Sequence, residues 1–141
     1  MKKVFSHMLS KKAQYAIKAL SYLVSRQSEC PILISEIAEK KQIPLKFLEN
    51  ILLELRKAGI LESKKGKGGG YLIKTNPEMT SLASVIRIID GPIAMLPCVS
   101  LYFYERCESC DEEQCKINGL FVEARDAVLG VLEQKTLADL K

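Results

Sequence analysis

The sequence has 141 residues, which is enough for one ordinary domain or for a small domain with an appendage. Apolar residues make up 48% of it, so a disordered polar chain is excluded and a packed core is predicted. The net charge of +4 divides unevenly, because residues 1–75 carry a net +9 and residues 76–141 a net −5. This asymmetry indicates a first half that meets a polyanion, although lysines that merely solubilise exposed helices are the alternative.

No membrane partner is expected, since no run approaches the roughly 20 apolar residues that a membrane span needs. We expect no secretory signal either, because polar residues and Lys11 and Lys12 interrupt the apolar stretch that such a signal requires. The protein is therefore predicted to be cytoplasmic. Thiols stay reduced in that compartment, so clustered cysteines favour metal or redox roles over structural disulfides.

Residues 9–26 are predicted to form the first helix, because apolar side chains recur there at helical spacing. The helix must end before Cys30 and Pro31, since the residue preceding a proline is pushed out of helical geometry. Cys30 lies far along the chain from the other four cysteines. We interpret it as a small buried hydrophobic residue.

A helix-turn-helix arrangement is predicted for residues 35–58. Ser35 is the expected N-cap of a short helix, which the sequence Gln42-Ile43-Pro44 ends. A longer helix then runs to about Ala58, where Gly59 stops it. Its inward stripe is expected to consist of Leu48, Ile51, Leu52 and Leu55. The second helix of such a motif can lie in the major groove of DNA, but many helical hairpins share this pattern.

Residues 60–73 are predicted to form a β-hairpin with a basic, glycine-rich tip. The strands are residues 60–63 and 71–73, and the tip between them contains three lysines and four glycines. Glycine lets a backbone approach a phosphate closely and lysine supplies positive charge, so the hairpin is suited to contacting DNA. A nucleotide-binding P-loop is not predicted here, because the sequence GK[ST] is missing and no helix follows the glycines directly.

Two further helices are expected. Thr80 or Ser81 caps one that ends at Ile89. The final helix runs from about Cys115 to Lys135. It is too long to be buried entirely against the small domain that the preceding elements form. Its apolar stripe consists of Ile117, Leu120, Phe121, Ala124, Val128, Val131 and Leu132. We expect this stripe to pair with its copy in a homodimer, and folding back on its own head is the alternative.

Four of the five cysteines fall between residues 97 and 118, namely Cys98, Cys107, Cys110 and Cys115. Thiolates this close together can bind one soft metal centre, either zinc or an iron–sulfur cluster. Reduced, unliganded thiols or a Cys107–Cys110 redox disulfide are the alternatives. Neighbouring acidic residues are expected to raise the pKa values of the thiols unless a cation or cluster is bound. The single histidine, His7, is interpreted as solvated.

The order of these elements resembles that of the IscR/NsrR-type winged-helix regulators of the bacterial Rrf2 family. The likeness spans residues 9–140, and its specific parts are the wing and the spacing from Asp90 to Cys98. The residues that carry it are Tyr15-Ala16, Leu48-Glu49, Leu55-Arg56-Lys57, Gly68-Gly69-Gly70-Tyr71-Leu72, Asp90, Cys98 and Thr136-Leu137-Ala138-Asp139-Leu140. The resemblance implies a mainly α fold with a small β-hairpin: a winged helix-turn-helix DNA-binding domain at residues 1–91, and a cysteine loop with a dimerisation helix at residues 92–141.

The resemblance also implies a homodimer on a pseudo-palindromic double-stranded DNA operator, with one recognition helix per half-site and wings in the flanking minor grooves. Carried over by position, the residues that would face bases are Leu45, Lys46, Glu49 and Asn50. Glu49 could accept from cytosine N4, and Asn50 could address adenine. Backbone or minor-groove contacts would come from Arg56, Lys64, Lys65, Lys67, Gly68, Gly69, Gly70 and Tyr71.

Many members of this family hold an iron–sulfur cluster that senses cluster supply, nitric oxide or redox state. They commonly use three cysteines with a histidine or a carboxylate. Here Asn118 stands where that histidine would fall in the IscR pattern, and the loop is longer and contains an extra thiol. A set of four thiolates leaves 2Fe–2S, 4Fe–4S and structural zinc open.

We therefore interpret the chain as a transcription regulator, not an enzyme, whose DNA affinity is controlled by an iron–sulfur cluster on Cys98, Cys107, Cys110 and Cys115. The alternative is a zinc-bound or metal-free DNA-binding regulator that responds to thiol oxidation or to a protein partner. A thiol redox enzyme is less favoured, because reactive thiols usually need cationic surroundings or a helix N-terminus.

Overall fold

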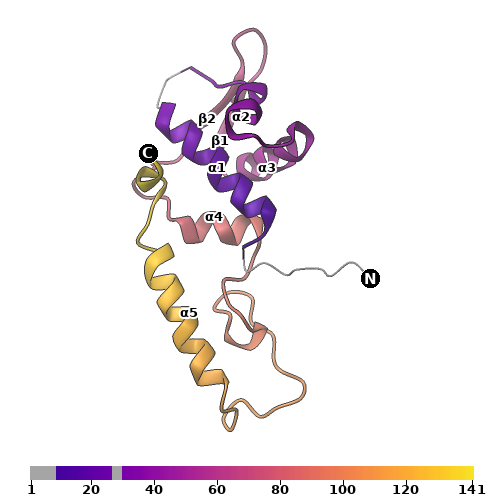
Figure 1. Cartoon of the computed structure of the whole chain (residues 1–141), viewed down its shortest axis with the longest axis vertical. Coiled ribbons are helices and arrows are strands. Elements are labelled where there is room, and N and C mark those ends of the chain that lie inside the picture. The colour runs from indigo at the N-terminus through magenta and orange to yellow at the C-terminus, as the bar shows by residue number, and fades with distance from the viewer. Residues whose placement is uncertain (1–8, 27–29) are drawn as a thin grey trace.

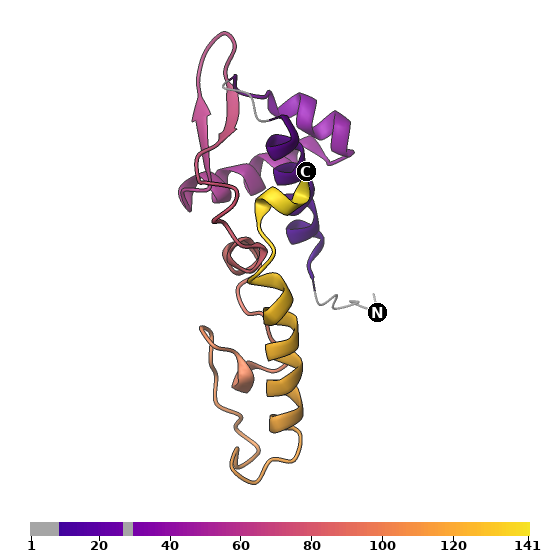
Figure 2. The ribbon, with the colours of Figure 1, turned by 90° about the vertical axis from the view of Figure 1, so that its left-hand side faces the viewer.

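The computed structural model describes residues 9–26 and 30–141, so His7 lies outside the described residues. A head of four helices and a β-hairpin carries an extension formed by one long helix and the cysteine loop, residues 92–117 (Figures 1 and 2). This arrangement confirms the predicted mainly α fold with a small hairpin. In the described part of the chain, no helix is long and apolar enough to cross a membrane.

The helix α1 (Lys11–Arg26) is the centre of the head. It contacts α2 (Ile34–Lys41), α3 (Leu45–Lys57) and α4 (Leu82–Ile89). Its buried face consists of Ala13, Ala16, Ala19, Leu20, Leu23 and Val24. The three alanines have small side chains, so the neighbouring helices can approach the α1 backbone closely.

The helix-turn-helix unit has the predicted inward stripe. The four residues of that stripe on α3 are fully buried: Leu48, Ile51, Leu52 and Leu55. The predicted N-cap of α2 is wrong, because Leu33 caps that helix and Ser35 lies inside its first turn. The carbonyl of Leu33 already accepts from the backbone N–H groups of Glu36 and Ile37, so the helix starts before Ser35 can cap it.

The wing is an antiparallel hairpin of β1 (Leu61–Lys64) and β2 (Gly70–Ile73). A third segment lies beside β2, because Ile32 and Tyr71 exchange two backbone hydrogen bonds of 2.9 Å. A Cβ atom at Gly70 would lie 2.3 Å from the carbonyl oxygen of Ile32, and φ at Gly70 is 148°. Only glycine therefore fits at this position without displacing the chain that leads into α2.

The structure contradicts the burial predicted for Cys30, whose side chain is exposed. The chain joins the core two residues later, at Ile32, whose side chain is 5% exposed. Cys30 stands ahead of that point and ahead of Pro31. It is therefore Ile32, and not Cys30, that contributes a buried side chain from this segment.

The long helix α5 (Asn118–Leu132) is about three residues shorter at each end than predicted. Leu129 is its one buried residue, and the predicted stripe is partly exposed, with Leu120 64% and Val131 58% accessible. Most of α5 extends away from the head rather than folding back over it (Figure 2).

The chain returns to the head after α5. The 3-10 helix η2 (Leu137–Leu140) contacts α1, and Leu137 is fully buried in the head core. The backbone N–H of Leu82 donates to the carbonyl of Lys135 at 2.8 Å, and that of Leu137 donates to the carbonyl of Thr80 at 2.9 Å. The last residues of the sequence therefore belong physically to the core of the head.

Replacing Leu137 by alanine is expected to lower the free energy of unfolding by about 2–5 kcal/mol, because it leaves a cavity in a fully buried site. Urea denaturation followed by circular dichroism measures this change. Leu101→Ala is the matched control, since Leu101 is 53% exposed and its loss should change stability by about 0.5 kcal/mol or less. Equal stability of the two variants would contradict the placement of η2.

Candidate nucleic-acid interface and cysteine cavity

The outward face of α3 presents the residues predicted to meet bases. Leu45 is 46% exposed, and Lys46, Glu49 and Asn50 are also exposed. They are exposed because the buried stripe occupies the opposite side of the same helix, which holds α3 against α1. The beginning of α3 thus offers a cation, a carboxylate and an amide from one rigid element.

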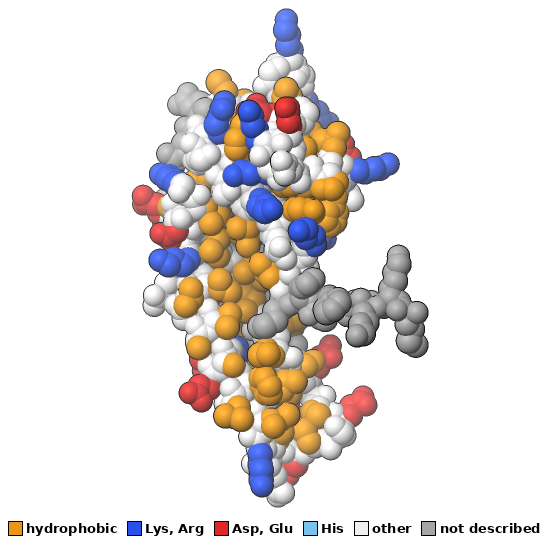
Figure 3. Space-filling model, in the orientation of Figure 1, with side chains coloured by type: hydrophobic (Ala, Val, Ile, Leu, Met, Phe, Trp, Pro, Cys, Tyr) orange, Lys and Arg blue, Asp and Glu red, His pale blue; other side chains and the backbone are white. Residues whose placement is uncertain are grey.

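Arg56 joins the end of α3 to the wing. Its Nη1 donates to the hydroxyl of Ser63 on β1 at 3.1 Å. At the tip of the hairpin Lys64, Lys65 and Lys67 are exposed. Lys and Arg side chains gather over the head in Figure 3, whereas hydrophobic side chains run along the extension.

The glycines of the wing differ in their surroundings. Gly68 is exposed, but Gly69 is buried, and a Cβ there would lie 2.3 Å from the carbonyl oxygen of Lys64. Tyr71 is half-buried and packs against the head core. Gly69, Gly70 and Tyr71 therefore shape the hairpin and fix its position, while the lysines form its accessible surface.

One contact between α3 and the rest of the head was not predicted from the sequence. Lys12 on α1 forms a salt bridge with Glu54 on α3. Both are separated by 42 residues, so no local pattern reveals the pair. The bridge adds a polar contact between α1 and α3, beside the buried stripe that sets which face of α3 is turned outward.

The four clustered cysteines line one cavity of about 240 Å³. Cys98 lies on the 3-10 helix η1 (Pro97–Val99), Cys107 and Cys110 lie in the following loop, and Cys115 lies just before α5. Cys110 is exposed and the other three are half-buried. The remaining lining residues are Leu96, Pro97, Glu105, Arg106 and Ile117. Residues spread over 18 positions of the sequence are thus brought to one place.

Four sulfurs are a soft donor set, which fits zinc or iron in its chemistry. Among residues 9–26 and 30–141, however, no group of three or more Cys, His, Asp or Glu is close enough to hold a metal ion. The four thiols therefore line one cavity, but they are not close enough together to coordinate a metal ion in this conformation. Binding a metal centre would require the loop to draw them together.

Hydrogen bonds within the cysteine loop shift the pKa values of the Cys107 and Cys110 thiols in opposite directions. The Ser109 hydroxyl, 3.4 Å from the Cys107 sulfur, and then the Cys110 thiol lower the pKa of Cys107 to about 7. The same pairing with Cys107 raises the pKa of Cys110 to about 12. The predicted rise is therefore wrong for Cys107, because hydrogen bonds from Ser109 and Cys110 to its sulfur outweigh the effect of burial on its pKa.

Two further contacts close the loop. The side-chain amide of Asn118, at the start of α5, lies 3.9 Å from the Cys98 sulfur and donates to it. The hydroxyl of Tyr104 donates to the carboxylate of Glu112. The first cysteine is thus linked directly to the long helix, and the middle of the loop is folded against itself.

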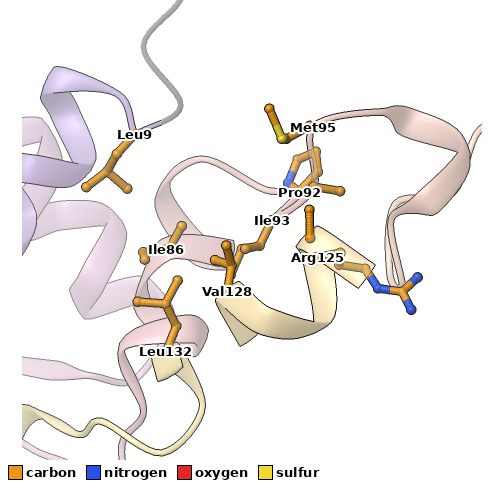
Figure 4. Close-up of a pocket in the computed structure, with 10 residues that line it drawn as sticks. Leu9, Ile86, Pro92, Ile93, Met95, Arg125, Val128 and Leu132 are labelled. Atoms are coloured by element: carbon orange, nitrogen blue, oxygen red, sulfur yellow. The ribbon is translucent and has the colours of Figure 1, made fainter. Parts of the chain in front are cut away.

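The exposed stripe of α5 borders an apolar pocket of about 230 Å³ (Figure 4). The pocket lies between α4, the segment after it and α5, and its lining residues are Leu9, Ile86, Pro92, Ile93, Ala94, Met95, Ala124, Arg125, Val128 and Leu132. Val128 and Leu132 belong to the stripe predicted to meet a second subunit. An open apolar surface therefore exists where that prediction requires one.

Known proteins resemble this chain over nearly its whole length. The model of the family described as Rrf2, iron-dependent transcriptional regulator, matches residues 9–141. An rrf2-like HTH-type transcriptional regulator of Rhodobacter capsulatus is 42% identical, covering 94% of this chain and 91% of the relative. The HTH-type transcriptional regulator IscR of Serratia proteamaculans is 30% identical, over 94% and 77%. The solved structure of CymR, the global cysteine regulator of Bacillus subtilis, has a TM-score of 0.76 at 29% identity and covers 93% of both chains.

Proposed function

Because this chain belongs to the Rrf2 family of transcriptional regulators, we propose that it is a homodimeric DNA-binding regulator whose operator affinity is set by an iron–sulfur cluster. The single observation that carries the proposal is the convergence of Cys98, Cys107, Cys110 and Cys115 on one cavity at the start of α5. The proposal needs three parts: a DNA reader, a sensing site and a joint between subunits.

The DNA reader consists of α3 and the wing. Lys46, Glu49 and Asn50 would meet base edges in the major groove, where a carboxylate discriminates for cytosine and an amide for adenine. The wing lysines would contact phosphates and contribute affinity without sequence preference. The exposure of all these side chains on the basic head supports this division of roles.

The sensing site consists of the four thiols. An iron–sulfur cluster bound there would supply iron whose charge and integrity depend on oxidants and nitric oxide. Loading would require thiolates, and Cys107 lies half-buried in the same cavity as Cys98 and Cys115. Asn118 lies beside Cys98 and would hold it at the end of α5 that faces the cavity.

The joint between subunits would be the apolar stripe of α5. Leu120, Val128 and Val131 are exposed on it, and the pocket at its base is open. Pairing with a second copy would cover these side chains and fix the spacing of the two heads. A preference of about 1–3 kcal/mol for one state of the loop would change operator affinity by about 5–150-fold.

A second candidate function is favoured by the hydrogen bond between Cys107 and Cys110. These thiols are separated by two residues and do not belong to a ready-made metal site within the described ranges 9–26 and 30–141. A zinc-bound or metal-free regulator that responds to thiol oxidation or to a protein partner would use the same pair.

Protein isolated without oxygen is expected to be brown and to contain iron and inorganic sulfide. Replacing any one of the four cavity cysteines (Cys98, Cys107, Cys110 or Cys115) by serine should abolish that content, because a hydroxyl is a poor ligand for soft metals. Cys30→Ser is the control and should retain it, since Cys30 does not line the cavity. Colourless protein with one zinc per chain would overturn the cluster and favour the second candidate.

Replacing Lys64, Lys65 and Lys67 by alanine is expected to weaken binding to all DNA sequences. Each lost phosphate contact should reduce the slope of log affinity against log salt by about 0.9. Fluorescence anisotropy at several salt concentrations measures this slope. Lys135→Ala, which removes an exposed lysine outside the wing, should leave it unchanged. An unaltered slope in the triple variant would show that the wing does not contact DNA.

Replacing Glu49 by glutamine is expected to relax specificity at one base pair by about 1–3 kcal/mol, because the carboxylate no longer selects its partner base. Affinities for a set of operator duplexes, each substituted at one position, measure the effect. Glu62→Gln, which changes an exposed carboxylate on β1, serves as the control. If every position loses affinity equally in Glu49→Gln, the residue does not read a base.

A further inference from the structure

The segment that directly follows Cys98 is held by two arginines from different helices. Arg125 on α5 donates from Nη1 to the carbonyl of Val99 at 2.7 Å, and its side chain is only 14% exposed. Val99 itself is 2% exposed. This end of the segment is therefore fixed firmly to α5, next to the cysteine cavity.

The other arginine, Arg87 on α4, joins three parts of the molecule. Its guanidinium carbon lies 4.5 Å from the centre of the Tyr102 ring in the cysteine loop. Its Nη2 also forms a 3.0 Å salt bridge with Glu133 at the end of α5. The guanidinium thus lies over the Tyr102 ring of the loop and also pairs with Glu133, a combination that its delocalised charge and several N–H donors permit.

These two contacts differ in strength from the anchor at Val99. Tyr102 is 69% exposed, and the Glu133 side chain is 49% exposed. Contacts at exposed sites are weakened by water and can break and re-form without unfolding the core. The Tyr102 contact is therefore suited to being made in one state of the loop and lost in the other.

The helix that carries Arg87 leads to the DNA-reading face. α4 contacts both α1 and α3. At its C-terminal end Asp90 accepts a hydrogen bond from the backbone N–H of Ser10 at 3.0 Å and another from the Ser10 hydroxyl, which in turn caps α1. A displacement of α4 is thus transmitted to the start of α1 and to the recognition helix.

We propose that Arg87 is the positioning residue through which the state of the cysteine cavity reaches the DNA-reading head, by stacking on Tyr102. This inference rests on the proposed function and deepens it. A rearrangement of the loop around the four thiols moves Tyr102 relative to the fixed Val99. The guanidinium then gains or loses its contact with the Tyr102 ring, and α4 shifts with it.

The test compares Tyr102→Leu with Tyr102→Phe. Leucine removes the aromatic face but keeps an apolar side chain, whereas phenylalanine keeps the face and removes only the hydroxyl. The first readout is the ratio of DNA affinities between iron–sulfur-loaded and emptied protein, measured on a duplex selected from a random library. We expect Tyr102→Leu to reduce this ratio at least fivefold at unchanged iron and sulfide content, and Tyr102→Phe to retain it.

The second readout does not need loaded protein. Amide hydrogen exchange within α4 should quicken in emptied Tyr102→Leu, because Arg87 loses its contact with the ring, and Tyr102→Phe should match the parent chain. A ratio and an exchange pattern that are the same in both variants would overturn the role of Arg87. Replacing Glu133 by glutamine adds a third arm and should also reduce the affinity ratio.

The outcomes separate this inference from the proposed function. A parent chain that binds DNA equally well with and without a cluster would contradict both. A parent chain that responds to the cluster, with a full response retained in Tyr102→Leu, would contradict only the role of Arg87. A purely structural role would instead lower the thermal stability of loaded and emptied protein alike and leave the affinity ratio unchanged.

Discussion

The architecture depends on one constraint: the extension leaves and rejoins the head at the two ends of the same helix. The chain departs at Asp90, where α4 ends and Ser10 donates two hydrogen bonds. It returns beside Thr80 and Leu82, where α4 begins, through backbone hydrogen bonds from residues 82 and 137. The roughly 45 residues between these points form the extension, and α4 lies where the extension meets the head (Figure 1). A conformational change in the extension therefore acts first on α4, which contacts both α1 and α3.

The head and the extension also differ in charge. The head carries the lysines of the wing and α3, whereas the middle of the cysteine loop is acidic. The head would be attracted to a polyanion and the loop repelled by it, so a bound polyanion would lie against the head and away from the loop. By themselves, carboxylates near a thiol would raise its pKa and so disfavour the thiolate. In Cys107 the hydroxyl of Ser109 reverses this tendency, so the loop keeps an ionisable thiol within acidic surroundings.

Periodic burial was predictable from the sequence, and contacts between distant residues were not. The stripe of Leu48, Ile51, Leu52 and Leu55 follows from helical spacing, and the hairpin follows from its glycines and flanking apolar residues. Cys30 was misplaced because burial depends on where the chain joins the core. The bridge from Lys12 to Glu54 and the contacts of Arg87 and Arg125 join residues between 15 and 46 positions apart. No local pattern encodes such pairs, so the convergence of the four thiols was foreseeable while the arginines around them were not.

The backbone pairing of Ile32 with Tyr71 has a consequence for the behaviour of the protein at high concentration. Unpaired strand edges invite other chains to add strands, which leads to aggregation. Here the segment before α2 covers part of one edge of the hairpin. The opposite strand, β1, is four residues long and carries the exposed charges of Glu62 and Lys64, which discourage strand addition. The wing can thus project far enough to reach a ligand while remaining a poor template for intermolecular β-sheets.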